Sequence, residues 1–218
     1  MSLNMRILIL SAHPDDETFG MGGTIKKYSN QGAEIDIFVI TDGTSAQYSD
    51  EKMIDVRRES CINAGKILGV KNFDFLDFPD AKLDNIPTLE ITQKIEEKIS
   101  TFKPEIIFTT PNNDGHQDHK KVNECTLIAA RPKTIFLKQI IQYELFSTNR
   151  TTFSPNLFVD ISKEFQPKLD AIKQYNSEIE DYPHVRSIKA VETLANMRGV
   201  ESGFEKAEAF KIIRSYMI

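Results

Sequence analysis

Residues 6–17 read RILILSAHPDDE, an apolar run that passes directly into a histidine and three carboxylates. A nearly uninterrupted run of this length is typical of a strand that is buried on both faces of a parallel sheet. The run is too short for the core of a signal peptide and far too short to span a membrane. We therefore expect residues 6–12 to form a buried strand with polar side chains at its C-terminal end.

Short apolar segments and stretches of helical spacing alternate along the rest of the chain. The predicted strands cover 34–41, 72–76, 105–110, 135–145 and 157–161. The predicted helices cover 18–31, 51–68, 87–102, 118–130, 162–180 and 185–198. This order predicts an α/β fold, with a Rossmann-like, mostly parallel sheet that is flanked by helices on both faces. The last fifty residues are expected to form a C-terminal helical extension, followed by an edge strand near 209–213.

The composition is that of a folded globular protein. Of the 218 residues, 40% are hydrophobic and 27% are charged, so the chain can bury a sizeable core. Its 27 basic and 32 acidic residues give a net charge of −5, which offers no electrostatic reason to bind nucleic acid or anionic lipid. The length predicts one domain over residues 5–218. Residues 1–4 precede a second methionine, Met5, and are interpreted as an expression remnant.

The two cysteines, Cys61 and Cys125, both fall in predicted helices. A chain of this length does not need disulfides, so both are expected to be buried free thiols in a reducing compartment. No targeting segment and no membrane span is recognisable in the sequence. These features predict a cytoplasmic protein.

Two polar clusters each follow a predicted buried strand. They hold three of the four histidines of the chain and several carboxylates: His13, Asp15 and Asp16 after the first strand, and His116, Asp118 and His119 after the strand at 105–110. Open α/β sheets bind ligands at the C-terminal ends of their strands, so we expect both clusters to face one cleft. Buried charge of this density must be paired or bound to metal. The clusters therefore indicate a metal site.

Imidazole and carboxylate ligands suit zinc, which in catalytic sites takes three protein ligands and keeps one position open. His13 and Asp16 are three residues apart across a tight turn, so both can point at one ion, with a third ligand from the second cluster. Asp15 would then point elsewhere, where a carboxylate can take a proton from water that the ion has acidified. Of the two histidines in the second cluster, one can bind the ion and the other can face the substrate. This pattern indicates hydrolysis of an amide or an ester.

Residues 12–17 (AHPDDE), residues 20–24 (GMGGT) and the later segment 116–119 (HQDH) together closely resemble the LmbE-like (PIG-L) family of zinc-dependent N-acetylglucosaminyl deacetylases. The resemblance extends over most of the chain. It implies three metal ligands: His13, Asp16 and His119. It also implies four further roles: Asp15 as general base, His116 as acid or oxyanion stabiliser, Asp118 as a residue that orients a histidine, and Arg57 as a contact to substrate.

By this resemblance the chain is expected to remove the N-acetyl group from an N-acetylglucosamine-type conjugate, which gives a free amine and acetate. The implied cofactor is Zn²⁺, with another divalent ion such as Fe²⁺ left open. The expected partner is a small amino-sugar conjugate of unknown aglycone, without nucleic acid or a membrane span, and homo-oligomerisation is left open. The alternative is a metal-binding member of the family that acts on a different amide or acyl substrate, or that lacks turnover.

Several features of these motifs admit other interpretations. The glycines at 20–23 suit a dinucleotide site, but carboxylates would repel a pyrophosphate there, so we interpret them as allowing the first helix to pack closely. Gln117 stands where the family commonly has proline, and we expect an altered stiffness of that loop.

His184 is expected on the surface. Tyr143 and Glu144 end a predicted strand and are candidates for lining the cleft.

Overall fold

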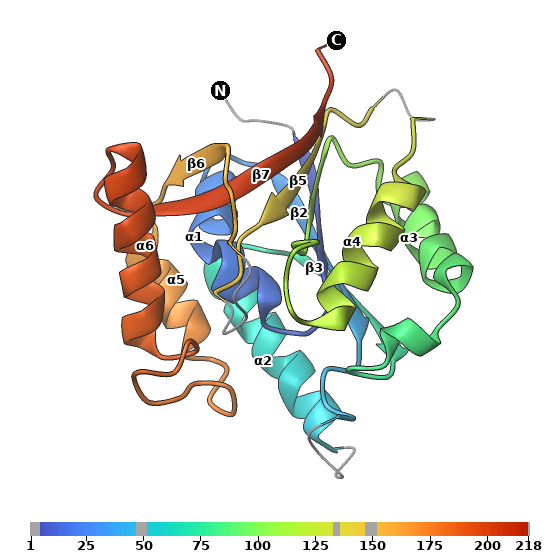
Figure 1. Cartoon of the computed structure of the whole chain (residues 1–218), viewed down its shortest axis with the longest axis horizontal. Coiled ribbons are helices and arrows are strands. Elements are labelled where there is room, and N and C mark those ends of the chain that lie inside the picture. Colours follow the sequence, from blue (N-terminus) through green and yellow to red (C-terminus); the bar gives the residue numbers. More distant parts are fainter. Residues whose placement is uncertain (1–4, 47–51, 133–135, 147–151, 218) are drawn as a thin grey trace.

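A seven-stranded sheet forms the centre of the computed structural model, which describes residues 5–46, 52–132, 136–146 and 152–217 (Figure 1). The strands are β1 (Arg6–Ser11), β2 (Glu34–Thr41), β3 (Asn72–Phe78), β4 (Ile106–Thr109), β5 (Gln139–Tyr143), β6 (Leu157–Asp160) and β7 (Ala207–Ser215). Their order in the sheet is β3-β2-β1-β4-β5-β7-β6. The first five are parallel, and β7 runs antiparallel to both of its neighbours. The predicted α/β fold with a mostly parallel sheet is confirmed.

Helices cover both faces of the sheet (Figure 1). Those in contact with one face are α1 (Asp16–Asn30), α2 (Lys52–Leu68) and α5 (Phe165–Ile172), and those in contact with the other are α3 (Thr88–Phe102) and α4 (Gln117–Ala129). The alternating side chains of β1 explain this arrangement, because Ile7 and Ile9 enter the first core while Leu8 and Leu10 enter the second. A short 3₁₀ turn (Leu83–Asn85) follows β3, and α6 (Ile188–Ser202) packs against β6 and β7.

The predictions about the cysteines, His184 and membrane spans can be compared directly with the structure. Cys61 and Cys125 are free and buried, as predicted. His184 is exposed, also as predicted. Among the described residues, no helix is both long enough and apolar enough to cross a membrane. Residues 1–4, which we interpret as an expression remnant, lie outside the described part of the chain.

Two expectations about the C-terminal part were wrong. The helix predicted over 162–180 ends at Ile172, where the chain passes into turns: the amides of Gln174 and Tyr175 donate to carbonyl oxygens three residues earlier. Glu178 then pairs with the buried Arg57. The strand predicted at the edge near 209–213 is β7, which pairs with β5 on one side and β6 on the other. The edge strand is β6, whose side chains are only partly buried.

The glycine-rich start of α1 lies close to the sheet, as interpreted from the sequence. The helix is kinked at Met21, where the backbone leaves helical geometry. A Cβ on Gly20 would come within 2.6 Å of the Tyr143 ring, and one on Gly23 within 2.8 Å of Ile161. Just after the kink, the Glu208 carboxylate accepts hydrogen bonds from the backbone amides of Gly23 (2.9 Å) and Thr24 (2.7 Å).

Replacing Gly23 with alanine should lower the free energy of unfolding by about 1–3 kcal/mol, because the added methyl group overlaps the stiff, β-branched Ile161 side chain. Gly22→Ala is the matched control on the same helix. Its Cβ comes within 3.1 Å of Lys168 Cγ, a smaller overlap than at Gly23, and alanine gains about 1 kcal/mol of helix propensity. Urea unfolding of both variants measures the difference. Equal stability of the two would contradict the close packing described for Gly23.

Candidate metal centre and active site

The site lies where the strand order of the sheet reverses. From β1 the chain proceeds to β2 on one side, whereas β4 pairs with β1 on the other side. The loops after β1 and β4 therefore diverge from a shared crevice, the position at which open α/β sheets bind ligands. The first loop carries His13 and Asp15, and the second carries His116, which begins α4. The two polar clusters predicted from the sequence thus meet in space.

His13, Asp16 and His119 form a buried group whose ligand atoms all lie within 4.8 Å of one another. Asp16 stands between the two rings, with Oδ2 3.5 Å from His13 Nδ1 and Oδ1 3.2 Å from His119 Nε2. Neither ring nitrogen of His119 makes a well-formed hydrogen bond among the described residues. Two imidazoles and one carboxylate, with both ring nitrogens of His119 unsatisfied, are a fitting ligand set for a divalent metal ion.

A second combination, His13, His116 and Asp118, also brings three potential ligand atoms together. Its carboxylate is already engaged, because Asp118 accepts backbone hydrogen bonds from Ala81 (2.7 Å) and Leu83 (3.1 Å). The group of His13, Asp16 and His119 has more ligand atoms without a hydrogen-bond partner, so it is the better candidate for the metal site.

The outer nitrogen of each candidate ligand histidine faces a carboxylate. His119 Nδ1 lies 3.1 Å from Asp114, and His13 Nε2 lies 3.0 Å from Asp80 and 3.4 Å from Asp118. Carboxylates in such positions fix the orientation of a metal-binding imidazole and increase its basicity. Sequence reasoning missed Asp80 and gave no role to Asp114. Both follow the C-terminal ends of strands, Asp80 after β3 and Asp114 after β4. The rule that ligands bind at the C-terminal ends of strands could therefore have identified them as well.

The carboxylates make this centre attractive to positive charge. Burial by itself would lower the pKa of His119, but Asp16 and Asp114 raise it to about 9. Burial also opposes ionisation of Asp16, yet the two histidines hold the pKa of that carboxyl well below its usual range. By contrast, burial and the charges of His13 and His119 lower the pKa of His116. The centre therefore stabilises cationic occupants, while His116 stays neutral more readily.

Asp15 is buried beside the candidate ligands, and its two carboxylate oxygens differ in their surroundings. Oδ2 lies 3.0 Å from Arg57 Nη2 and 3.4 Å from Arg186 Nη1. Oδ1 has no hydrogen-bond partner among the described residues. Asp15, Asp16, His116 and His119 all line one cavity of about 210 Å³. One oxygen of Asp15 is thus held by arginines, and the other is free to accept a proton.

Arg57 lies behind Asp15 and does not line the cavity. Its side chain is 3% exposed, and it contacts the Gly43 carbonyl oxygen at 2.5 Å and Glu178 at 3.4 Å. Arg186 does line the cavity, with its side chain 35% exposed, and it also pairs with Glu178. A molecule in the cavity would therefore meet Arg186 rather than Arg57 in this conformation. Sequence reasoning missed Arg186, because the segment around it carries no motif.

Three further residues from the sequence analysis, Tyr143, Glu144 and Gln117, lie in different environments. Glu144 lines the cavity, whereas Tyr143 is fully buried and donates a hydrogen bond to the Leu10 carbonyl oxygen at 3.1 Å. Gln117 donates side-chain hydrogen bonds to the Ala81 carbonyl oxygen and to Asp84. It therefore anchors its loop to the segment after β3.

Glu17 forms a buried polar network directly behind the metal loop. Its carboxylate accepts hydrogen bonds from Ser11 (3.2 Å), Thr18 (2.9 Å) and Tyr175 (2.8 Å). Burial raises the pKa of Glu17 to about 7. The network ties the first turn of α1 to the segment that follows α5.

The comparison with protein-family models matches residues 8–130 to PIG-L, described as GlcNAc-PI de-N-acetylase. This span covers more than half of the chain and contains His13, Asp16 and His119. Among similar proteins, the diacetylchitobiose deacetylase of Thermococcus kodakarensis is 29% identical, over 95% of this chain and 83% of that protein.

Solved structures share the fold over nearly the whole chain. The N,N'-diacetylchitobiose deacetylase from Pyrococcus horikoshii superposes with a TM-score of 0.81 at 24% identity, over 95% of this chain and 83% of that one. The 4-carboxy-2-hydroxymuconate hydratase GalB from Pseudomonas putida gives 0.82 at 19% identity, over 98% of both chains. Because a hydratase shares this fold with deacetylases, the fold by itself does not decide the reaction.

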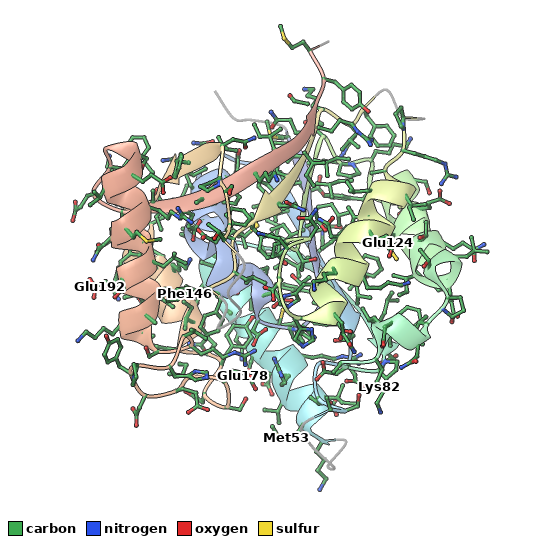
Figure 2. The ribbon with its side chains drawn as sticks, in the orientation of Figure 1. Met53, Lys82, Glu124, Phe146, Glu178 and Glu192 are labelled. Carbon is green, nitrogen blue, oxygen red and sulfur yellow. The ribbon has the colours of Figure 1, made fainter. Side chains whose placement is uncertain are left out.

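Removing one ligand should empty the metal centre. His119→Ala is expected to abolish stoichiometric metal, and Asp114→Asn to weaken metal affinity roughly 10- to 100-fold by releasing the His119 ring. Elemental analysis and chelator competition measure the two effects. The control is Glu124→Gln on the exposed side of α4, a residue labelled in Figure 2. Unchanged metal content in His119→Ala would show that the ligand set is wrong.

Proposed function

The chain belongs to the PIG-L family, and from this premise we propose that it is a metal-dependent deacetylase of N-acetylglucosamine-type conjugates. The observation that carries this proposal is the shared cavity. Two of the candidate metal ligands, Asp16 and His119, line it beside Asp15, a buried carboxylate with one free oxygen, and His13 lies next to them. A substrate amide in this cavity would meet both features at once.

His13, Asp16 and His119 would hold the ion. When bound, the ion supplies Lewis-acid chemistry that polarises an amide carbonyl and acidifies water. We propose zinc as the native ion, because two imidazoles and one carboxylate are a frequent ligand set in zinc hydrolases. The same set suits Fe²⁺, so the identity of the ion needs a direct measurement.

Asp15 is the proposed general base. Its Oδ2 is held by Arg57 and Arg186, so Oδ1 stays oriented to accept a proton from the attacking water. The water oxygen adds to the acetyl carbonyl carbon, the nitrogen receives the proton that Asp15 took from the water, and the C–N bond then breaks to release the amine. The products are acetate and the free amino sugar.

His116 is proposed to assist from the other side of the cavity. Its ring stacks on His119 at 4.8 Å and lies edge-on to His13 at 4.6 Å, so it is adjacent to both imidazole ligands. Its Nδ1 accepts a hydrogen bond from the Asp118 backbone amide, so in the neutral ring Nε2–H is left to donate a hydrogen bond to the oxyanion. Asp118 is proposed to orient His13 through its contact with Nε2.

The proposed setting is the cytoplasm, with a small amino-sugar conjugate as substrate. Both cysteines of the chain are free thiols, which fits a reducing compartment. The net charge of −5 also fits a partner other than nucleic acid.

Asp15→Asn should retain metal and fold but lose at least ~10²-fold in turnover, because an amide cannot accept the proton. Acetate release from N-acetylglucosamine conjugates measures turnover, and elemental analysis confirms the loading of each sample. Asp55→Asn, an exposed change on α2, is the matched control and should keep full activity.

Full activity of Asp15→Asn would rule out Asp15 as the base. If the metal-loaded, unaltered protein released no acetate from any N-acetylated sugar, the deacetylase proposal would fail. The alternative, a family member with a different acyl substrate or without turnover, would then stand.

A further inference from the structure

Four charged side chains form a closed ring of ion pairs beside the candidate metal ligands. We call this group the charge ring; in order around it, the members are Asp15, Arg57, Glu178 and Arg186. The side chains of both carboxylates are only 2% exposed, and their two negative charges are balanced by the two guanidinium groups. The proposed reaction uses Asp15 but assigns no task to Glu178.

Both arginines of the charge ring meet Asp15 through the same oxygen. Arg57 Nη2 donates a hydrogen bond to Oδ2 at 3.0 Å, and Arg186 Nη1 lies 3.4 Å from that oxygen. Pairs of arginine and carboxylate are frequently bidentate, with two N–H groups bound to the two oxygens. Here Oδ1 is buried and has no hydrogen-bond partner among the described residues. Other groups must therefore direct the remaining N–H groups of the arginines away from it.

The two arginines differ in how firmly they are held away from Oδ1. Arg57 Nη1 donates to the Gly43 carbonyl oxygen at 2.5 Å and lies 3.4 Å from Glu178, and its side chain is 3% exposed. Arg186 is 35% exposed, and Nη1 donates its hydrogen bond to Glu178 Oε2. In the described part of the chain, Glu178 and Asp15 are the only carboxylates paired with Arg186. Arg186 is thus the arginine that has room to turn, and Glu178 restrains it.

Glu178 is fixed by its own turn as well as by the arginines. It lies in the turns after α5, next to α2 (Figure 2). Its backbone amide donates to the Tyr175 carbonyl oxygen at 2.9 Å, and the Ser177 hydroxyl donates to Oε1 at 3.2 Å. Oε2 is the oxygen that accepts from Arg186. The carboxylate is therefore oriented to compete with Asp15 for the guanidinium of Arg186.

We propose that Glu178 is a positioning residue: it keeps Arg186 from binding both oxygens of Asp15 and so leaves Oδ1 available as the proton acceptor. The proposal rests on the deacetylase function proposed above, because it concerns the base of that reaction. Without the charge of Glu178, Arg186 has only Asp15 as a charged partner, and bidentate pairing supplies a second charge-assisted hydrogen bond. That bond occupies the lone pairs of Oδ1 that would take the proton from water.

Glu178→Gln tests this role, because it keeps the shape of the side chain and removes its charge. We expect kcat for acetate release from an N-acetylglucosamine conjugate to fall at least roughly tenfold, without exceeding the loss measured for Asp15→Asn. Metal content, measured by elemental analysis, should stay unchanged. The matched control is Glu180→Gln, an exposed residue two positions further along, which should keep full activity. Thermal unfolding shows that each variant is folded.

A double variant separates positioning from a purely structural role. Arg186→Gln removes the guanidinium that Glu178 restrains, while Arg57 stays bound to the Gly43 carbonyl oxygen. The loss of kcat caused by Glu178→Gln should therefore largely disappear when it is measured against Arg186→Gln alone. The cost of Arg186→Gln by itself is present in both proteins of that comparison and cancels. An equal loss in both backgrounds would mean that Glu178 does not act through Arg186.

A crystal structure of Glu178→Gln gives a readout that does not depend on turnover. An Arg186 nitrogen within hydrogen-bond distance of Asp15 Oδ1 would support the proposal, and an Oδ1 still without an arginine partner would overturn it. If Glu178→Gln does not fold, Glu178→Asp takes its place. That change withdraws the carboxylate from Arg186 by one methylene, and the same comparison with Arg186→Gln applies.

The two proposals fail in different ways. Turnover by the unaltered protein together with undiminished kcat in Glu178→Gln would overturn the role of Glu178 and leave the deacetylase function standing. An absence of turnover with every N-acetylated sugar would overturn the deacetylase function. The crystal structure of Glu178→Gln would then still decide whether Glu178 keeps Arg186 away from Oδ1.

Discussion

The pairing of buried imidazoles with buried carboxylates is the interaction on which the organisation of this protein depends. Asp16 lies between His13 and His119, and each ring meets a further carboxylate at its outer nitrogen. None of these charges could be buried alone, because an unpaired ion in such a crevice costs several kcal/mol. The loops after β1, β3 and β4 therefore converge at the position where the strand order reverses.

A second set of buried polar contacts holds the C-terminal half against this centre. Tyr175 donates to Glu17, and Glu178 bridges Arg57 and Arg186, which also contact Asp15. Figure 2 shows Glu178 beside α2, the helix that carries Arg57. The segment after α5 is thus positioned by specific long-range polar partners. Its position brings Arg186 into the cavity and makes the environment of Asp15 dependent on residues more than a hundred positions away.

The parts of this structure that could be predicted from the sequence are those with a local signal. The alternation of apolar runs with segments of helical spacing led to the fold class, and the histidine-carboxylate motifs at strand ends, together with the family resemblance, led to the grouping of His13, Asp16 and His119. The partners of Arg57 could not be predicted, because Glu178 is far away in sequence and lies in a segment without periodicity. The place of β7 within the sheet was missed for a related reason. Its apolar pattern shows that it is buried, but not which strands flank it.

The inner position of β7 has a consequence for the order in which the molecule can be completed. Strand β6 has β7 as its sheet neighbour, so it cannot join the sheet until residues beyond 206 have left the ribosome. Glu208, which holds the backbone just after the kink in α1, arrives at the same moment. The five parallel strands can assemble during synthesis, whereas β6 must wait for the final strand. A nascent chain that already carries every candidate metal ligand therefore still lacks one wall of its cavity.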